Sequence, residues 1–228
     1  MIGIFDSGAG GLTALSELRK IQPSIDICFL ADRKNAPYGT KTRREIIKLV
    51  TEDIIKLRSA GADTILMACC TASTVYPFLR SGLKRVACPI IAPAAEEAAL
   101  VTENGKIGVI ATDLTVRSGA FSKELSKYKT ASVTELPAQE LVSLVESGVK
   151  DGSMTEGARK KLANLLSPLK AERIDTLILG CTHFPHLERE ISGCLPGVRL
   201  INPSKEGAKK IIKNSPTLQG KGITVYLE

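Results

Sequence analysis

The chain has 228 residues, of which 43% are hydrophobic, so it is long and apolar enough to bury a full core and is not a disordered chain. Its formal net charge is +7, but the basic residues are spread over predicted helix faces and aromatic residues make up only 4%, which favours a solvated surface over a nucleic-acid site. No apolar run approaches the roughly 20 residues of a membrane-spanning helix, and the first residues lack a signal-peptide pattern, so we expect a cytoplasmic protein that does not bind membranes.

In the first part of the chain, apolar runs of strand length alternate with segments of helical spacing. In chain order we expect strand 1–5, turn 6–11, helix 12–21, strand 25–31, loop 32–39, helix 42–60, strand 63–69, helix 71–80 and strand 88–93. Gly61 is the expected stop of the helix 42–60. In the loop, Pro37 and Gly39 punctuate the chain and present Tyr38 between them. The strand 88–93 is bracketed by prolines, which marks a candidate domain boundary.

The turn Asp6-Ser-Gly-Ala-Gly-Gly11 follows the first strand directly. It directs backbone N–H groups and the positive end of the following helix beyond the sheet, which suits a carboxylate or a phosphate. The phosphate interpretation is weak because the Gly-Lys-Ser/Thr ending of a P-loop is missing. Asp6 fits a turn or helix-cap role as well as a catalytic one, and we favour the catalytic role.

The second part of the chain repeats the alternation of strand and helix. We expect strand 106–113, helix 115–126, strand 131–136, helix 139–147, helix 155–170, a strand from residue 175, a short helix after residue 186, strand 198–201, helix 204–213 and strand 222–227. Residues 202–203 read as the return across the domain boundary. Regular alternation of this kind predicts an α/β protein with a mainly parallel sheet in each half.

One stretch of the sequence occurs twice. Asp63-Thr-Ile-Leu-Met-Ala-Cys-Cys-Thr71 aligns without a gap on the segment that starts at Asp175, at an offset of 112 positions (175 − 63), which pairs Cys69 with Cys181. The strand 106–113 also resembles the first strand, at an offset near 105. The repeat places one thiol just past the carboxyl end of a strand in each half, at the edge where open α/β sheets bind ligands. Two such thiols suit chemistry on both faces of one small molecule.

The cysteines have other interpretations. The sharpest is a zinc site, with the candidate ligands Cys69, Cys70, Cys181 and His183. Neither copy of the repeat has a C-x-x-C pair, and adjacent cysteines chelate poorly, so we predict no metal site and no thiol redox role. The remaining cysteines are expected to be small core side chains: Cys28, Cys88 and Cys194.

Four motifs, in this order and spacing, carry a family resemblance: Asp6-Ser-Gly-Ala-Gly-Gly11, Pro37-Tyr-Gly39, Ala68-Cys-Cys-Thr-Ala-Ser73 and Gly180-Cys-Thr-His183. Over nearly the whole chain they resemble the glutamate racemases of the cofactor-independent aspartate/glutamate racemase superfamily. The resemblance implies two pseudo-symmetric α/β domains, residues 1–93 plus 203–228 and residues 94–202, with the active site in the cleft between them. It also implies interconversion of L- and D-glutamate without a cofactor, supply of D-glutamate for peptidoglycan and hence cell shape, and a homodimer.

The same resemblance implies roles for individual residues. Cys69 and Cys181 would be the acid and base pair, Asp6 and His183 would assist one thiol each, and Glu146 would orient His183. The implied substrate-binding set is Asp6, Ser7, Tyr38, Gly39, Cys70, Thr71, Thr112, Thr115, Thr182 and His183. Cys70 stands where the family has an asparagine, which removes an amide expected to touch the substrate.

Racemisation is chemistry that these residue types can perform. It needs a base on one face of the α-carbon and an acid on the other, and two equivalent cysteines can exchange those roles. Two other classes of function stay open. One is another enzyme of the superfamily with the same thiol pair, such as an aspartate racemase or a hydantoin or maleate isomerase. The other is a binding protein that keeps the fold without turnover, for which Cys70 is the sequence signal.

Overall fold

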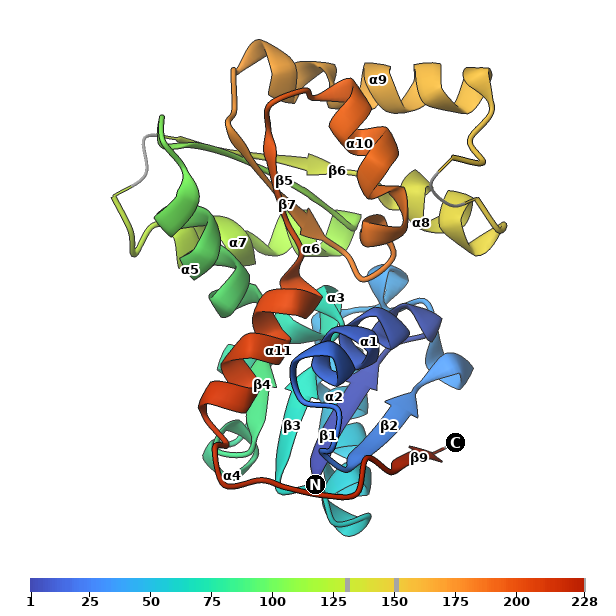
Figure 1. Ribbon diagram of the computed structural model, residues 1–228, viewed down its shortest axis with the longest axis vertical. Coiled ribbons are helices and arrows are strands. Elements are labelled where there is room, and N and C mark those ends of the chain that lie inside the picture. Colours follow the sequence, from blue (N-terminus) through green and yellow to red (C-terminus); the bar gives the residue numbers. More distant parts are fainter. Residues whose placement is uncertain (130–131, 150–151, 228) are drawn as a thin grey trace. The chain divides into compact units, whose positions relative to one another are not determined.

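The computed structural model describes residues 1–129, 132–149 and 152–227, and within these residues the chain forms two compact units. The first unit comprises Met1–Pro93 and Pro203–Glu228, and the second comprises Ala94–Asn202. Each unit contains a parallel β-sheet with helices packed against it (Figure 1). The predicted α/β class with parallel sheets is therefore confirmed.

Within the described residues, the first unit is built on a five-stranded parallel sheet in the order β4-β3-β1-β2-β9. Its strands are β1 Ile2–Asp6, β2 Ile27–Ala31, β3 Thr64–Met67, β4 Ala87–Pro89 and β9 Thr224–Leu227. Its helices are α1 Leu12–Ile21, α2 Arg43–Ser59, α3 Cys70–Ser73, α4 Ser81–Lys84 and α11 Pro203–Lys213. Short 3₁₀ helices lie at η1 Ala9–Gly11, η2 Arg33–Asn35, η3 Tyr38–Thr40 and η4 Tyr76–Phe78.

Helices cover both faces of this sheet. In Figure 1, α1 and α11 lie together on one side and α2 lies on the other, and α2 contacts β1 and β2. The five residues of β1 are all buried, as expected for a strand covered on both faces. Helix α2 begins with a capping box, in which Glu45 N donates to Thr42 Oγ1 at 3.3 Å and Thr42 N donates to Glu45 Oε2 at 2.7 Å. Gly61, with φ of +93°, follows the helix and confirms the predicted stop.

The second unit contains, in the part of the chain that is described, a four-stranded parallel sheet in the order β6-β5-β7-β8. Its strands are β5 Lys106–Ala111, β6 Ser132–Pro137, β7 Thr176–Gly180 and β8 Arg199–Ile201. Its helices are α6 Asp113–Ser118, α7 Ala120–Leu125, α8 Gln139–Glu146, α9 Glu156–Ala171 and α10 Glu188–Cys194, with a 3₁₀ helix at η5 Phe184–Leu187. One apolar core joins α8, α9 and α10 to β7, through Leu141, Leu162, Ile191 and Leu179.

The two sheets repeat one topology and one register. The strand order β4-β3-β1-β2 corresponds to β8-β7-β5-β6. In the first sheet Ile2 is paired with Thr64, and in the second Ile107 is paired with Thr176. Equivalent residues therefore differ by 105 in one strand (107 − 2) and by 112 in the other (176 − 64). Both offsets seen in the sequence describe the same repeated pair of strands.

The predicted helix over residues 71–80 is wrong. The chain instead forms the short helix α3, the 3₁₀ turn η4 and the short helix α4. Pro77 has no N–H to donate to the preceding turn, and its ring would clash with that turn, so a continuous helix cannot pass through it.

The predicted strand over residues 88–93 is right only in its first part. β4 ends at Pro89, and α5 Ile91–Val101 follows and continues into the second unit. Pro93 lies in the first turn of α5, where a missing N–H has no helical acceptor to lose. No predicted element corresponds to α5.

Two further boundaries differ in the second unit. The predicted helix over residues 115–126 is divided into α6 and α7, because Gly119 adopts a left-handed conformation with φ of +61°. The predicted strand 131–136 is present as β6 from Ser132, and residue 131 lies outside the described residues.

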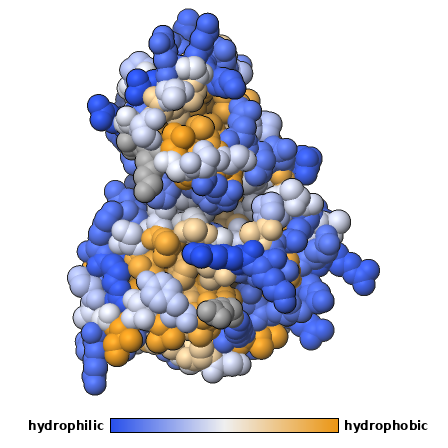
Figure 2. Space-filling model, turned by 90° about the vertical axis from the view of Figure 1, so that its right-hand side faces the viewer, coloured by the Kyte–Doolittle hydropathy of each residue, from blue (hydrophilic) through white to orange (hydrophobic). Residues whose placement is uncertain are grey.

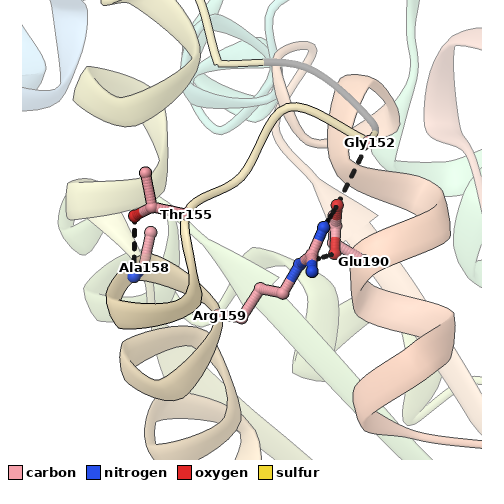
Figure 3. A network of polar contacts seen from close by, with 5 residues as sticks. All are labelled: Gly152, Thr155, Ala158, Arg159 and Glu190. Atoms are coloured by element: carbon pink, nitrogen blue, oxygen red, sulfur yellow. Dashed lines mark hydrogen bonds and ion pairs between the residues drawn. The ribbon is translucent and has the colours of Figure 1, made fainter.

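A polar network ties the start of α9 to α10 (Figure 3). Glu190 on α10 accepts hydrogen bonds from Arg159 Nε and from Gly152 N, each at 3.1 Å. Thr155 caps α9 by accepting the N–H of Ala158 at 3.3 Å. These bonds hold the residues that precede α9 against the neighbouring helix.

The edge strand β9 and the residue before it leave apolar side chains exposed, namely Val225 and Tyr226 in the strand and Ile223 before it. Figure 2 shows the face of the molecule that carries β9, where hydrophobic residues gather among hydrophilic ones. Tyr226 also packs edge-on against Phe29 of β2, with ring centroids 5.8 Å apart. None of the helices in the described ranges combines the length and the apolar character needed to cross a membrane.

Candidate active site

The predicted site residues of the first unit lie at the carboxyl edge of its sheet. Asp6 is the last residue of β1, and Cys69 follows the end of β3. β1 and β3 are neighbours in the sheet, with Phe5 paired to Met67. Because parallel strands end at a common edge, the fold brings Asp6 and Cys69 together there.

Cys69 is a buried thiol with two hydrogen-bond partners. Its Sγ lies 3.3 Å from Ser7 Oγ, and Ala72 N donates to the same sulfur at 3.4 Å, so that Cys69 caps α3. Burial and, secondly, the negative charge of Asp6 raise the pKa of Cys69 to about 11, while the hydrogen bonds from Ser7 and Ala72 act in the opposite direction. The protonated thiol is therefore favoured near neutral pH, and a positive group close to Asp6 would favour the thiolate.

Asp6 is completely buried, and its Oδ2 accepts the N–H of Gly8 at 2.9 Å. This bond corresponds to the turn role that the sequence allows for Asp6. The negative charge of the same carboxylate also raises the pKa of Cys69. Gly11 lies so close that a Cβ at this position would collide with the Cβ of Asp6. The glycine run therefore lets the start of α1 approach Asp6 directly.

Cys70 and Thr71 are the first two residues of α3, and both are almost fully buried. The structure gives the two adjacent cysteines different positions. Cys69 has an extended backbone and caps the helix, whereas Cys70 lies within it.

Tyr38 is not presented by its loop, contrary to the expectation. Its side chain is 1% exposed, and its hydroxyl lies 2.7 Å from Asp32 Oδ2 and 3.0 Å from Asp53 Oδ2. Burial and the two carboxylates raise the pKa of Tyr38. The 3₁₀ turn η3, which contains Tyr38 and Gly39, contacts α3. The backbone of this turn, at Gly39 in particular, can contact a ligand, while the Tyr38 hydroxyl anchors the turn to Asp32 and Asp53.

In the second unit, the predicted site residues form a chain of contacts at the carboxyl edge of β7. Cys181 follows the last residue of β7, and its Sγ lies 3.5 Å from His183 Nδ1. On the other side of the ring, His183 Nε2 lies 3.4 Å from Glu146 Oε1 at the end of α8. The structure therefore brings together the three residues for which a joint role was expected.

The surroundings of His183 favour its neutral form. Burial lowers the pKa of His183, and the charge of Glu146 only partly opposes this effect. If Nε2–H donates to Glu146, the neutral ring has an acceptor at Nδ1, which faces the Cys181 thiol. In this arrangement His183 can receive the thiol proton and return it.

Three threonines surround the equivalent edge of the second sheet. Thr112 follows β5 and caps α6, with its Oγ1 2.8 Å from Thr115 Oγ1 and accepting Thr115 N at 3.3 Å. Thr182 follows Cys181 directly, and all three side chains are buried. The structure brings Thr112 and Thr115 together as a hydroxyl pair.

Two contacts were missed from the sequence. Ser7 was expected to bind substrate, but its hydroxyl also contacts the Cys69 sulfur. The contact of Asp53 with the Tyr38 hydroxyl is the second. Asp53 is an acidic residue on the apolar face of α2, beside the buried Val50, Ile54 and Leu57, and this position is a sequence signal that could have found it.

Among residues 1–129, 132–149 and 152–227, no three His, Cys, Asp or Glu side chains converge as ligands for a metal ion.

The chain is similar to known proteins in both sequence and structure. The family model described as Asp/Glu/Hydantoin racemase matches residues 14–211. A glutamate racemase from Persephonella marina is 39% identical over 222 residues, which cover 97% of this chain and 85% of that protein. The crystal structure of glutamate racemase isoform RacE1 from Bacillus anthracis superposes with a TM-score of 0.88 at 32% identity, covering 99% of this chain and 86% of that chain. A glutamate racemase from Francisella tularensis, solved in complex with D-glutamate, superposes with a TM-score of 0.85 at 29% identity, covering 99% and 85%.

Proposed function

This chain belongs to the Asp/Glu/hydantoin racemase family, and we propose that it interconverts L- and D-glutamate without a cofactor. The observation that carries the proposal is the pair of thiols, Cys69 and Cys181, at register-equivalent strand ends in the two repeated sheets. The similarity to glutamate racemases, one of them solved with D-glutamate, supports glutamate as the substrate.

In the proposed mechanism, each unit contributes one thiol to one face of the substrate. The thiolate of one cysteine removes the α-proton, and the thiol of the other delivers a proton to the opposite face. The two cysteines exchange protonation states with each turnover and exchange roles in the reverse direction. Residues 1–93 with 203–228 supply Cys69, and residues 94–202 supply Cys181. We assign Cys69 to the D-enantiomer and Cys181 to the L-enantiomer.

Each thiol has its own means of becoming a base. Near Cys69, a substrate ammonium group would offset the charge of Asp6 and so lower the raised pKa of the thiol. Near Cys181, neutral His183 accepts the thiol proton at Nδ1 while Glu146 holds the ring.

The substrate carboxylates need donors, because negative charge develops beside them as the α-proton leaves. Backbone N–H groups of the turn after β1 and of η3 are one source. Hydroxyl groups are the other, and we assign this role to Ser7, Thr71, Thr112, Thr115 and Thr182.

The wider role that we propose is the supply of D-glutamate for peptidoglycan, by a homodimer in the cytoplasm. The family supports the role, the dimer follows from the resemblance, and the location follows from the sequence pattern. Light scattering of the purified protein measures the oligomeric state, and a monomer at working concentration would contradict that part.

Polarimetry tests the activity directly. Purified protein incubated with L- or D-glutamate, without added cofactor, should bring the optical rotation to zero from either side. Activity should survive EDTA and hydroxylamine and be lost with a thiol alkylator. Loss with EDTA would argue for the zinc site in place of the thiol pair, and activity only on another substrate, in a panel with aspartate, hydantoins and maleate, would replace glutamate.

Replacing one thiol at a time tests the assignment of faces. Cys69→Ser and Cys181→Ser should each lose racemisation by several orders of magnitude, because a hydroxyl is too weak an acid to provide the base at neutral pH. Elimination from a β-leaving-group analogue needs only the first proton removal. Cys69→Ser should retain elimination from the L-form and Cys181→Ser from the D-form, so processing of the same enantiomer by both variants would contradict the assignment.

A further inference from the structure

A buried cluster in the first unit links α2 to the turn η3. Asp53 on α2 is 8% exposed, and its Oδ2 lies 3.0 Å from the hydroxyl oxygen of Tyr38. Asp32 Oδ2 lies 2.7 Å from the same oxygen, and Asn35 Nδ2 donates to Asp32 Oδ1 at 2.9 Å. Tyr38 is thus held between two carboxyl groups from different parts of the chain.

The hydrogen bonds of this cluster require a second proton. A phenol has one proton and can donate it to one carboxylate, so the other carboxyl oxygen must itself bring a proton to the phenol oxygen. Asp53 suits this role, since burial and the charge of Asp32 raise its pKa to about 7. Tyr38 then donates to the closer Asp32, and protonated Asp53 donates to Tyr38.

The charged groups around Asp53 come from two elements. On α2 itself, Lys56 lowers the pKa of Asp53 and Glu52 raises it, while across the contact Asp32 and Tyr38 act on it from the loop after β2. Glu52 is 59% exposed and paired with Lys48 at 3.9 Å, so solvent screens it. The dominant neighbour is therefore the Asp32 and Tyr38 pair.

The cluster acts where substrate is expected. The turn η3 contacts α3, which Cys69 caps, and α2 contacts α3 as well. We propose that Asp53 is a positioning residue of the racemase: its carboxyl proton holds the Tyr38 hydroxyl, and thereby the Tyr38–Gly39 backbone beside α3, in the conformation that binds substrate. This inference rests on the proposed function, because it concerns the substrate site of that reaction.

Loss of the proton should loosen the turn. When Asp53 ionises, two carboxylates face one phenol that can satisfy only one of them, and the repulsion is relieved by moving η3. KM should then rise with pH while kcat changes less, because the turn binds substrate and does not exchange the α-proton.

The experiment compares KM and kcat at about pH 6 and about pH 8.5 for the wild type, Asp53→Asn and Asp53→Ala. In the wild type KM should rise about tenfold across this range, as expected for the loss of one hydrogen bond to a charged or buried partner. Asp53→Asn, whose amide donates to the phenol at every pH, should keep the low KM throughout, and Asp53→Ala should have the high KM at both values. Glu52→Gln on the same helix is the matched control, and its KM should follow the wild type.

Unfolding in urea separates this inference from the proposed function. The pKa of an aspartate in the unfolded chain is about 4, and that of Asp53 in the folded protein is about 7. Between these two pH values only the folded protein keeps the proton, so the stability that this group contributes is lost as pH rises from about 4 to about 7. The wild type should therefore lose stability relative to Asp53→Asn over this window. An identical pH dependence of KM and of stability in the two proteins would overturn the inference. If the wild type does not racemise glutamate, the proposed function fails, and the unfolding comparison still decides whether Asp53 holds the proton.

Discussion

His183 lies between the exposed carboxylate of Glu146 and the buried thiol of Cys181. The contact with Glu146 can be altered by a substitution at that exposed position. Glu146→Gln keeps the size of the side chain but removes the charge that raises the pKa of His183, while burial continues to lower it. We expect the pKa of His183 to fall, and only modestly, since the Glu146 side chain is 62% exposed and screened by solvent. NMR titration of the His183 ring measures this, and a raised pKa in the variant would contradict it.

The same variant has a kinetic consequence that is specific to a racemase. The two enantiomers have equal free energy in water, so kcat/KM must fall equally in both directions. A different effect on the two enantiomers can therefore appear only in a half-reaction. Elimination from the L-form of a β-leaving-group analogue should slow by about two- to fivefold in Glu146→Gln, while the D-form should be unaffected. Glu140→Gln, at the exposed start of the same helix, is the control. An equal loss on both enantiomers would place Glu146 outside the Cys181 half-site.

Cys70 stands where the resemblance implies an asparagine, and the structure buries it within α3 beside the capping residue Cys69. As a neighbour of the thiol, it should tune binding, so Cys70→Ala should change KM more than kcat. Cys70→Asn restores the family residue and should raise glutamate turnover. Loss of all turnover in Cys70→Ala with binding intact would show that the catalytic assignment belongs to Cys70 instead of Cys69.

At the scale of elements, the end of β7 positions Cys181. The last residue of β7, Gly180, has no room for a side chain. A Cβ on Gly180 would lie 2.7 Å from the backbone oxygen of Ile110 and 3.0 Å from Phe121. Gly180→Ala should therefore push β7 away from β5 and destabilise the protein by about 1–3 kcal/mol, as overpacking does. Denaturant unfolding measures the change. An unchanged free energy of unfolding would mean that the sheet accommodates the added methyl group without losing stability.

A matched glycine lies on α10. Nothing lies within 4 Å of a Cβ on Gly193, which is inside the helix. Gly193→Ala should stabilise the protein by about 0.5–1 kcal/mol, because alanine loses less conformational freedom than glycine on entering a helix. Opposite signs for the two substitutions would separate a steric requirement at Gly180 from a general effect of glycine.

For the whole molecule, binding and turnover can be separated with a double variant, Cys69→Ser with Cys181→Ser. It should bind both enantiomers without interconverting them, because the donors to the carboxylates remain. Either enantiomer at 100 times its Kd should then raise the free energy of unfolding by about 2.7 kcal/mol, measured by thermal or urea unfolding. Stabilisation without racemisation in the wild type itself would instead support the binding-protein alternative.

Local sequence was sufficient to predict the repeated strands and the thiols at their ends. A parallel strand buried on both faces needs a continuous apolar run, so Thr64–Met67 and Thr176–Gly180 are recognisable without knowledge of their partners. The two offsets between the halves likewise survive as one register in the folded sheets. Alternation of strand and helix then favours parallel sheets, whose carboxyl edges carry the site.

The partners of the site residues were decided by the tertiary structure. Ser7 contacts Cys69 across 62 positions, and Tyr38 contacts Asp53 across 15, because β1 pairs with β3 and the turn η3 packs beside α2 and α3. A local pattern reports which residues prefer burial, but it does not report which buried groups meet. The resemblance places Tyr38 in the substrate-binding set, while in the folded chain its hydroxyl contacts two carboxyl groups, which only the packing of separate elements brings together.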